Sequence, residues 1–455
     1  MPSNSLTWKH LRQTFVLSIP IVLGQLSIMG MQLTDTVMVA PLGADALAAS
    51  AIANIIFITV CVFGMGILSI LTPQIANAKV KLKYWRTNLL LTNALYLAIV
   101  LGVFSWLVNV LICYNFHWLA QPIEVERLAI PYLKVLSASA LPLILFIAIR
   151  SFTDGLSLVM PGMIISLVGI GVNIILNLLF LNGYWGAPKM GIDGSALATL
   201  LTRWAMFLVL LGWIFFAKQT RPYIADFSIF RIRKGVIFKF LRLGMPIGAQ
   251  SIFEVGAFTV SSVMIGWLGV APLAAHEIGI SMSSATYMVS FGFAIASSIL
   301  VGGAYGNQKH EMRNYGNSAL ILVILWMGLA GLSFVLTPNF WVACFIKEND
   351  TQEVFKIASS LMILAGLYQL ADGVQCVALG ILRGMEDTKI PSVFSFVAYW
   401  VIGLPLGYVL AFWLKLGVQG VWIGLSCGLL LIAISLTLRF YWLVNKKMKI
   451  IDNTK

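Results

Sequence analysis

The sequence predicts an all-α integral membrane protein with twelve spanning helices, on three grounds: composition, twelve long apolar runs and an internal duplication. Of its 455 residues, 60% are apolar and only 10% are charged, and the mean hydropathy is +0.92. A soluble globular protein carries about 25% charged residues. The chain is therefore too apolar to be soluble at any number of domains, and its length allows about a dozen spans with their loops.

The apolar runs are continuous, which indicates helices. A membrane β-barrel instead needs strands of about ten residues in which polar and apolar residues alternate. The first run follows a basic start and is too long for the apolar part of a signal peptide, so we expect it to be retained as a helix. The expected spans are 12–40, 46–72, 88–113, 128–150, 161–182, 193–217, 240–266, 272–303, 316–345, 355–381, 391–413 and 417–444.

The positive charges predict the orientation of these spans. If the N-terminus is cytoplasmic, 23 of the 30 lysine and arginine residues fall on the cytoplasmic side. Cytoplasmic loops of membrane proteins carry this excess, so both termini are expected to be cytoplasmic. The same distribution explains the net charge of +13 without a nucleic-acid partner. The five cysteines are scattered and predict neither disulfides nor a metal site.

The two halves of the chain resemble each other. The segment TDTVMVAPLGADALAAS at 34–50 aligns without gaps on VSSVMIGWLGVAPLAAH at 260–276, and the same offset superposes Pro20 on Pro246. Six helices per half give both halves the same topology, so we expect two pseudo-symmetric six-helix lobes around a central cleft, related by an axis along the membrane normal. The predicted parts are an N-terminal lobe at 1–217, a cytoplasmic linker at 218–239, and a C-terminal lobe with a basic cytoplasmic tail at 240–455.

Four acidic residues lie inside apolar spans, and they are the main functional signal: Asp35, Glu254, Glu277 and Asp372. Each costs about 2.5–3.5 kcal/mol at the middle of a bilayer. Of the basic residues, only Arg203 is expected at such depth. Because a carboxyl group taken out of water binds a proton or a cation, we predict that Asp35, Glu254 and Asp372 couple transport to H⁺ or Na⁺. Structural pairing with other groups of the chain is the alternative.

Polar neighbours accompany these acids. Tyr368, Asp372 and Gln375 share one helical face at i, i+4 and i+7 spacing, and Asn173 and Asn177 are one turn apart. Such residues also join membrane helices by hydrogen bonds, which is the structural alternative for each of them. The candidate lining of a substrate or coupling site is Gln32, Asn173, Asn177, Thr199, Tyr368 and Glu277.

Pro20 lies in the same span as Asp35. Proline removes a backbone hydrogen bond and permits a bend. A static kink is one interpretation. The sharper hypothesis is that protonation of Asp35 changes the curvature of span 12–40 and displaces the substrate. The 27 Phe and 18 Met suggest an aromatic, Met-rich cleft that, together with carboxylates, suits flat lipophilic cations.

Apparent enzyme motifs are incomplete. His276-Glu277 begins an H-E-x-x-H pattern, but Ile280 stands at the second histidine position. The G-x-S-x-G match at 424–428 lies inside a predicted helix, where it indicates a helix-packing face. The sequence contains no Walker A motif. We therefore expect a protein that is not an enzyme and has no cofactor beyond a coupling ion.

Two motifs, MQLTDTVMVAPLGADALAA at 31–49 and YQLADGVQCVALGILRGMEDTKIP at 368–391, resemble those of the MATE transporters, closest to the bacterial NorM-type branch. The resemblance spans essentially the whole chain. It implies a multidrug efflux transporter of the bacterial inner membrane that exports cationic drugs or dyes by alternating access, in exchange for H⁺ or Na⁺.

The resemblance also implies roles for individual residues. Asp35 would be the coupling acid of the N-terminal lobe, beside Asn173 and Asn177. Glu254 and Asp372 would bind the cation in the C-terminal lobe, with a Na⁺ ion as one occupant. Some proton-coupled members carry a second acid where this chain has Asn177, which puts a two-carboxylate relay in doubt.

Other functions stay open at this stage. A flippase of a lipid-linked or amphipathic substrate is the alternative to efflux, although a flippase for a pyrophosphate headgroup would need a cationic cleft. An ion channel is less consistent with acids in both lobes. We expect a monomer in the lipid bilayer.

Overall fold

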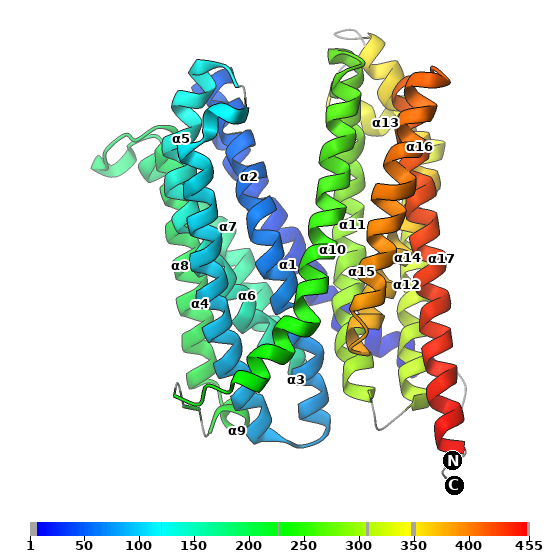
Figure 1. Ribbon diagram of the computed structural model, residues 1–455. Helices are drawn as coiled ribbons and strands as arrows, with labels where there is room; N and C mark the ends of the chain where they lie inside the picture. Colours follow the sequence, from blue (N-terminus) through cyan, green and yellow to red (C-terminus); the bar gives the residue numbers. More distant parts are fainter. Residues whose placement is uncertain are drawn as a thin grey trace. The chain divides into compact units, whose positions relative to one another are not determined.

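The computed structural model describes residues 7–119, 121–225, 227–228, 230–305, 309–346 and 352–452. Two residues of the predicted linker (226 and 229) and the end of the predicted basic tail (453–455) lie outside this part. In the described ranges the secondary structure is helical, without a strand, and twelve spans are long and apolar enough to cross a membrane (Figure 1). The predicted all-α, twelve-span class is confirmed.

The spans are built from helices of very different length. The first half of the chain contains α1 (Trp8–Val39), α2 (Ala44–Leu68), α3 (Leu71–Val80), α4 (Tyr84–Tyr114), α5 (Ile123–Ala138), α6 (Ala140–Gly155), α7 (Met160–Phe180), α8 (Ile192–Phe216) and α9 (Arg221–Ile224). The second half contains α10 (Lys234–Gly266), α11 (Val270–Ala304), α12 (Lys309–Leu336), α13 (Pro338–Ala343), α14 (Gln352–Gly384), α15 (Lys389–Phe396), the π-helix η4 (Val397–Gly403), α16 (Leu404–Tyr408), the π-helix η5 (Val409–Trp413) and α17 (Gly417–Asp452).

The chain packs into two compact units. The N unit comprises residues 23–248, and the C unit comprises residues 1–22 and 249–455. The chain therefore passes from one unit to the other only inside α1 and α10, in each case two residues after a proline, Pro20 or Pro246. These packing units differ from the predicted lobes at two segments, because the predicted lobes follow the duplicated sequence and assign each whole helix to one half.

Specific contacts hold the start of α1 in the C unit. His10 Nε2 lies 2.8 Å from Glu311 Oε2 of α12, and the hydroxyl of Tyr315 donates to Gln13 Oε1 at 2.8 Å. Near the same part of α12, the hydroxyl of Tyr441 on α17 donates to Asn317 Oδ1 at 3.0 Å. The first and last helices of the chain therefore both contact the same part of α12.

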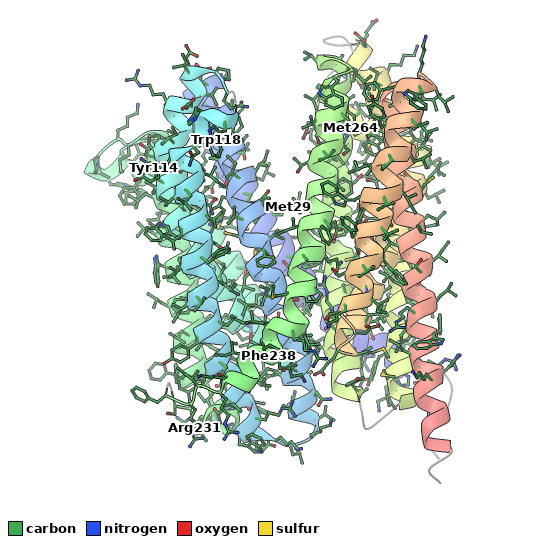
Figure 2. The ribbon with its side chains drawn as sticks, in the orientation of Figure 1. Met29, Tyr114, Trp118, Arg231, Phe238 and Met264 are labelled. Atoms are coloured by element: carbon green, nitrogen blue, oxygen red, sulfur yellow. The ribbon has the colours of Figure 1, made fainter. Side chains whose placement is uncertain are left out.

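The start of α10 belongs equally firmly to the N unit. The backbone N–H of Arg233 donates to Asn93 Oδ1 of α4 at 2.9 Å, and Phe240 is fully buried. A Cβ added to Gly66 of α2 would lie 2.8 Å from the Cα of Gly248, so this crossing of two backbones requires glycine. Figure 2 shows Tyr114 and Trp118 at one end of the N unit and Arg231 at the other.

The two units bury separate apolar cores. In the C unit, α14 runs through the core and packs against α11, α12 and α17. In the N unit, α6 packs against α4, α3 and α8, and α5 packs against α2. Each unit therefore surrounds one membrane helix with several others, and this burial gives the polar side chains described next fixed surroundings.

Candidate functional site

The N unit holds Asp35 in a closed set of hydrogen-bond donors. Asp35 lies near the end of α1 and is only 6% exposed. The amide of Asn177 on α7 donates to its Oδ1 at 2.8 Å, and the hydroxyl of Thr199 on α8 donates to its Oδ2 at 2.7 Å. Each carboxylate oxygen thus has its own donor, and three helices meet at one carboxyl group.

Asn173 completes this cluster, which we call the N site (Asp35, Asn173, Asn177 and Thr199). It lies one turn before Asn177, whose amide nitrogen is 3.2 Å from Asn173 Oδ1. Both asparagines are fully buried, and within the described residues Asn177 Oδ1 has no hydrogen-bond partner. The N site therefore offers several oxygen atoms around one acid, which is the ligand type that a proton or a hard cation such as Na⁺ prefers.

A buried guanidinium stands one turn from the N site on α8. Nη1 of Arg203 donates to Ser139 Oγ at 2.5 Å, and the guanidinium carbon lies 4.7 Å from the centre of the Phe57 ring. In the part of the chain that the structure describes, Asp35 forms no ion pair. Arg203 therefore supplies positive charge to the surroundings of Asp35 while its own partners are a hydroxyl and an aromatic face.

The C unit holds the second cluster, the C site (Glu254, Tyr287, Asp372, Gln375 and Tyr399). The hydroxyl of Tyr287 on α11 donates to Glu254 Oε1 of α10 at 3.3 Å. The amide nitrogen of Gln375 on α14 lies 3.2 Å from the same oxygen and 3.5 Å from Asp372 Oδ1. Its third neighbour is the hydroxyl of Tyr399 in η4, at 2.9 Å.

One amide nitrogen therefore lies between two carboxyl groups. Two carboxylates this close in a low-dielectric interior repel each other, and both ionise only if a cation or other positive charge is present. The guanidinium of Arg383 lies two turns beyond Gln375 on α14, and its Nη2 is 3.4 Å from Oε1 of Gln250, one turn before Glu254. The C site can hold one proton, or one small cation between Glu254 and Asp372.

The other predicted lining residues have mixed positions. Tyr368 is buried one turn before Asp372, and its ring packs against Trp422 at 5.6 Å between centroids. Gln32 and Glu277 have exposed side chains and belong to neither cluster. Pro20 is buried in the part of α1 that lies in the C unit.

Among the basic residues the sequence singles out only Arg203, but two further arginines are also buried or half-buried within the protein. Arg150, 6% exposed on α6, lies 3.7 Å from Asp154 Oδ2, and Arg383 is half-buried at the end of α14. Both belong to the last turns of their spans, where sequence position alone resembles a cytoplasmic loop. Glycine at position 24 leaves room for the buried side chain of Arg150, because a Cβ on Gly24 would lie 2.5 Å from the guanidinium.

The buried His276 side chain forms hydrogen bonds that join neighbouring helices. The indole N–H of Trp422 donates to Nδ1 at 3.0 Å, which leaves Nε2 to carry the proton toward Ser262 Oγ at 2.9 Å. The neutral ring thus links α17, α11 and α10. In the described ranges no three His, Cys, Asp or Glu side chains gather as a metal site would require.

Sequence reasoning missed two members of the C site. Tyr287 and Tyr399 are two tyrosines among 72 aromatic and methionine residues, and neither stands out by type. One feature of the sequence could have pointed to Tyr399. It lies eight residues after Pro391 and four before Gly403, in the stretch where the α-helix widens into the π-helix η4. A π-helix of this kind often marks a functional site.

Twelve membrane spans, repeated sequence halves and one carboxyl cluster in each compact unit are typical of transporters rather than enzymes. The MatE family model matches residues 20–179 and 246–409, two segments that begin at Pro20 and Pro246. The chain therefore belongs to the MatE family of multidrug efflux transporters, as the resemblance predicted.

Relatives and solved structures agree with this assignment. The chain is 31% identical over 459 residues to the probable multidrug resistance protein NorM of Agrobacterium fabrum, covering 99% of this chain and 97% of the relative. It is 33% identical to the multidrug resistance protein NorM of Aliivibrio fischeri, covering 97% and 96%. The fold matches the crystal structure of the eukaryotic MATE transporter AtDTX14 with a TM-score of 0.86 at 19% identity, covering 96% and 98%.

Proposed function

We propose that this protein exports lipophilic organic cations across the bacterial inner membrane in antiport with H⁺ or Na⁺, by alternating access. The observation that carries the proposal is the N site, where a buried carboxyl group has a hydrogen-bond donor on each oxygen and no ion-pair partner among the described residues. Such a group exchanges a proton or a cation more readily than a carboxylate that is already neutralised by a fixed arginine.

The C site supports a second ion-binding position. Glu254 and Asp372 share the amide of Gln375, so the occupancy of this cluster changes the repulsion between them. We assign coupling to Asp35, Glu254 and Asp372, and polar lining to Asn173, Asn177, Thr199 and Tyr368. Gln32 and Glu277 stay candidates for the substrate side because their side chains are exposed.

Pro20 connects the N site to a change of shape. α1 carries Asp35 in the N unit and Pro20 in the C unit, and the missing backbone hydrogen bond at Pro20 lets the helix bend there. Protonation of Asp35 replaces an acceptor by a donor within the cluster, so the contacts with Asn177 or Thr199 change. We propose that α1 bends in response and that the bound cation is released.

The energetics depend on stoichiometry. One proton exchanged for one monovalent cation moves no net charge, so a gradient of one pH unit sustains about a tenfold substrate gradient. If a second proton enters, one net charge also crosses, and a potential of 100 mV adds about 2.3 kcal/mol. The dependence of export on membrane potential therefore reports whether one or both sites are used.

The test is transport of a fluorescent lipophilic cation in proteoliposomes of the purified full-length protein. A pH gradient and a Na⁺ gradient are imposed separately, each with the potential clamped. Transport under the pH gradient alone supports coupling to a proton, which the Asp35→Asn variant then assigns. Transport under the Na⁺ gradient alone favours Glu254 and Asp372 as the coupling residues. Transport under neither gradient refutes antiport and favours the flippase alternative.

Asp35→Asn is the decisive variant, because it keeps the shape of the side chain and removes its titration. We expect it to abolish export while expression stays normal. Asp45→Asn is the matched control, since Asp45 is exposed in the first turn of α2. Normal export by Asp35→Asn would show that the buried acid is structural.

A further inference from the structure

A groove opens on the C unit between the last two membrane spans. Its volume is about 300 Å³, and its walls are Val393, Phe394 and Val397 on one side and Leu431, Ile432 and Ser435 on the other. Figure 1 shows α15 beside α17. Val393 is 59% exposed and Leu431 is 39% exposed, so both walls face the surrounding solvent, which in a membrane span is lipid.

The groove leads to a cationic cluster along the same stripe of α17. Positions 431, 435, 439, 442 and 446 follow one another at helical spacing. Arg439 Nε donates to Asp387 Oδ2 at 2.9 Å, and its guanidinium lies 4.6 Å from the Trp442 ring centre. The ammonium of Lys446 lies 5.0 Å from the same ring.

The start of α15, which forms the other wall of the groove, lies at the same cationic end. The bond between Arg439 and Asp387 fixes the start of α15 beside this part of α17. Lys389, the first residue of α15, is exposed one turn before Val393. Lys389 stands at the start of its apolar span, and Arg439 and Lys446 follow the apolar stretch of α17, so these charges lie where the apolar segments end.

We propose that this groove, with its cationic end, binds one anionic phospholipid. An acyl chain lies along Val397 and Ser435, in a channel too apolar for a polar ligand. The phosphate lies against Lys389 and Lys446, and against the terminal N–H groups of Arg439 that Asp387 leaves free. The Trp442 indole occupies the headgroup level.

This end of the groove carries three cationic side chains, Lys389, Arg439 and Lys446, and two carboxylates, Glu386 and Asp387. Its net positive charge favours an anionic headgroup over a zwitterionic one. Each lysine beside an anionic lipid changes affinity by about fivefold. Removing Lys389 and Lys446 together is therefore expected to lower the preference for an anionic lipid by about 25-fold.

The experiment is native mass spectrometry of the purified protein. Dioleoyl phosphatidylglycerol competes with dioleoyl phosphatidylcholine, which has the same chains and a zwitterionic headgroup. The wild type should retain one phosphatidylglycerol selectively. Lys389→Gln with Lys446→Gln should lose the selectivity, whereas the control pair Lys83→Gln with Lys234→Gln removes the same charge from exposed positions elsewhere and should keep it.

A second pair of variants tests the groove itself. Ser435→Phe fills it and should reduce retention of both lipids, while Ile434→Phe, on the neighbouring exposed position, should not. Equal retention of the two lipids by the wild type would overturn the proposal, and so would full selectivity in the Lys389 and Lys446 double variant. Because these lysines are exposed, their removal leaves the fold intact, and the readout requires no transport.

Discussion

Thr199→Val tests the N site by removing one hydroxyl without changing the shape of the side chain. That hydroxyl donates to Asp35 Oδ2 at 2.7 Å. Both groups are buried, so water does not replace the lost donor. The ionised carboxylate loses a charge-assisted hydrogen bond, whereas the protonated acid still finds acceptors among the neighbouring amide oxygens.

The size of the effect follows from the strength of that bond. A hydrogen bond to a charged group contributes about 1.5–3 kcal/mol. One pH unit corresponds to about 1.4 kcal/mol. Because the variant destabilises the ionised form, Asp35 takes up its proton at higher pH, and the midpoint for proton-driven release of the substrate should rise by about one to two pH units.

The assay is equilibrium binding of a fluorescent lipophilic cation, followed by anisotropy from pH 5 to 9 in nanodiscs. Thr199→Ser keeps the donor and should keep the wild-type midpoint. Thr202→Val is the matched control, because Thr202 is buried on the same helix and donates only to the backbone carbonyl of Ala198. An unchanged midpoint in Thr199→Val, or an equal rise in Thr202→Val, would refute the assignment of the proton to Asp35.

Three further predictions concern the other features. The double variant Glu254→Gln with Asp372→Asn should remove any Na⁺ response of dye transport in proteoliposomes, and an unchanged response would exclude the C site from coupling. Gly66→Ala should lower the thermal unfolding temperature, because overpacking against a backbone costs about 1–3 kcal/mol, whereas Gly171→Ala, which meets open space, should not. Trp422→Phe should destabilise the protein by about 1–3 kcal/mol in the same melting assay, since it leaves the buried histidine of α11 without its donor; a wild-type melting curve would contradict that reading.

The N site could be predicted from the sequence because polar residues are rare in apolar spans. Asp35 and the Asn173–Asn177 pair stand out against leucine and isoleucine, and helical spacing puts the two asparagines on one face. What the sequence does not specify is which faces meet across helices. Gln32 lies one turn from Asp35, yet the structure exposes it and brings Thr199 to the carboxylate instead.

The break at Ser139 shows a second limit. The run 128–150 reads as one continuous span, but α5 ends and α6 begins there, and the Ser139 hydroxyl receives Arg203. Local hydropathy does not mark this position, but Pro142 does, because it has no N–H to donate to the carbonyl of Ala138, where α5 ends. Asp387 shows that long-range partners matter as well. It follows Arg383 by four residues, just as Asp154 follows Arg150, yet it pairs with Arg439 of α17.

The exchange of helix starts between the two units sets the order in which the protein can be assembled during synthesis. The start of α1 is made first, yet the Glu311 that binds His10 is made 301 residues later. The N unit likewise stays incomplete until Gly248 has left the ribosome. The first helix must therefore wait, half of it without its final neighbours, until the second half of the chain has entered the membrane.

The same exchange predicts how a divided chain would behave. A cut in the connection between α8 and α10 yields two fragments, each carrying the end piece of the other fragment's unit. Each fragment can reach the native packing only when the other fragment supplies the missing helix end. The two halves are therefore expected to fold when they are coexpressed and not to fold when each is made alone.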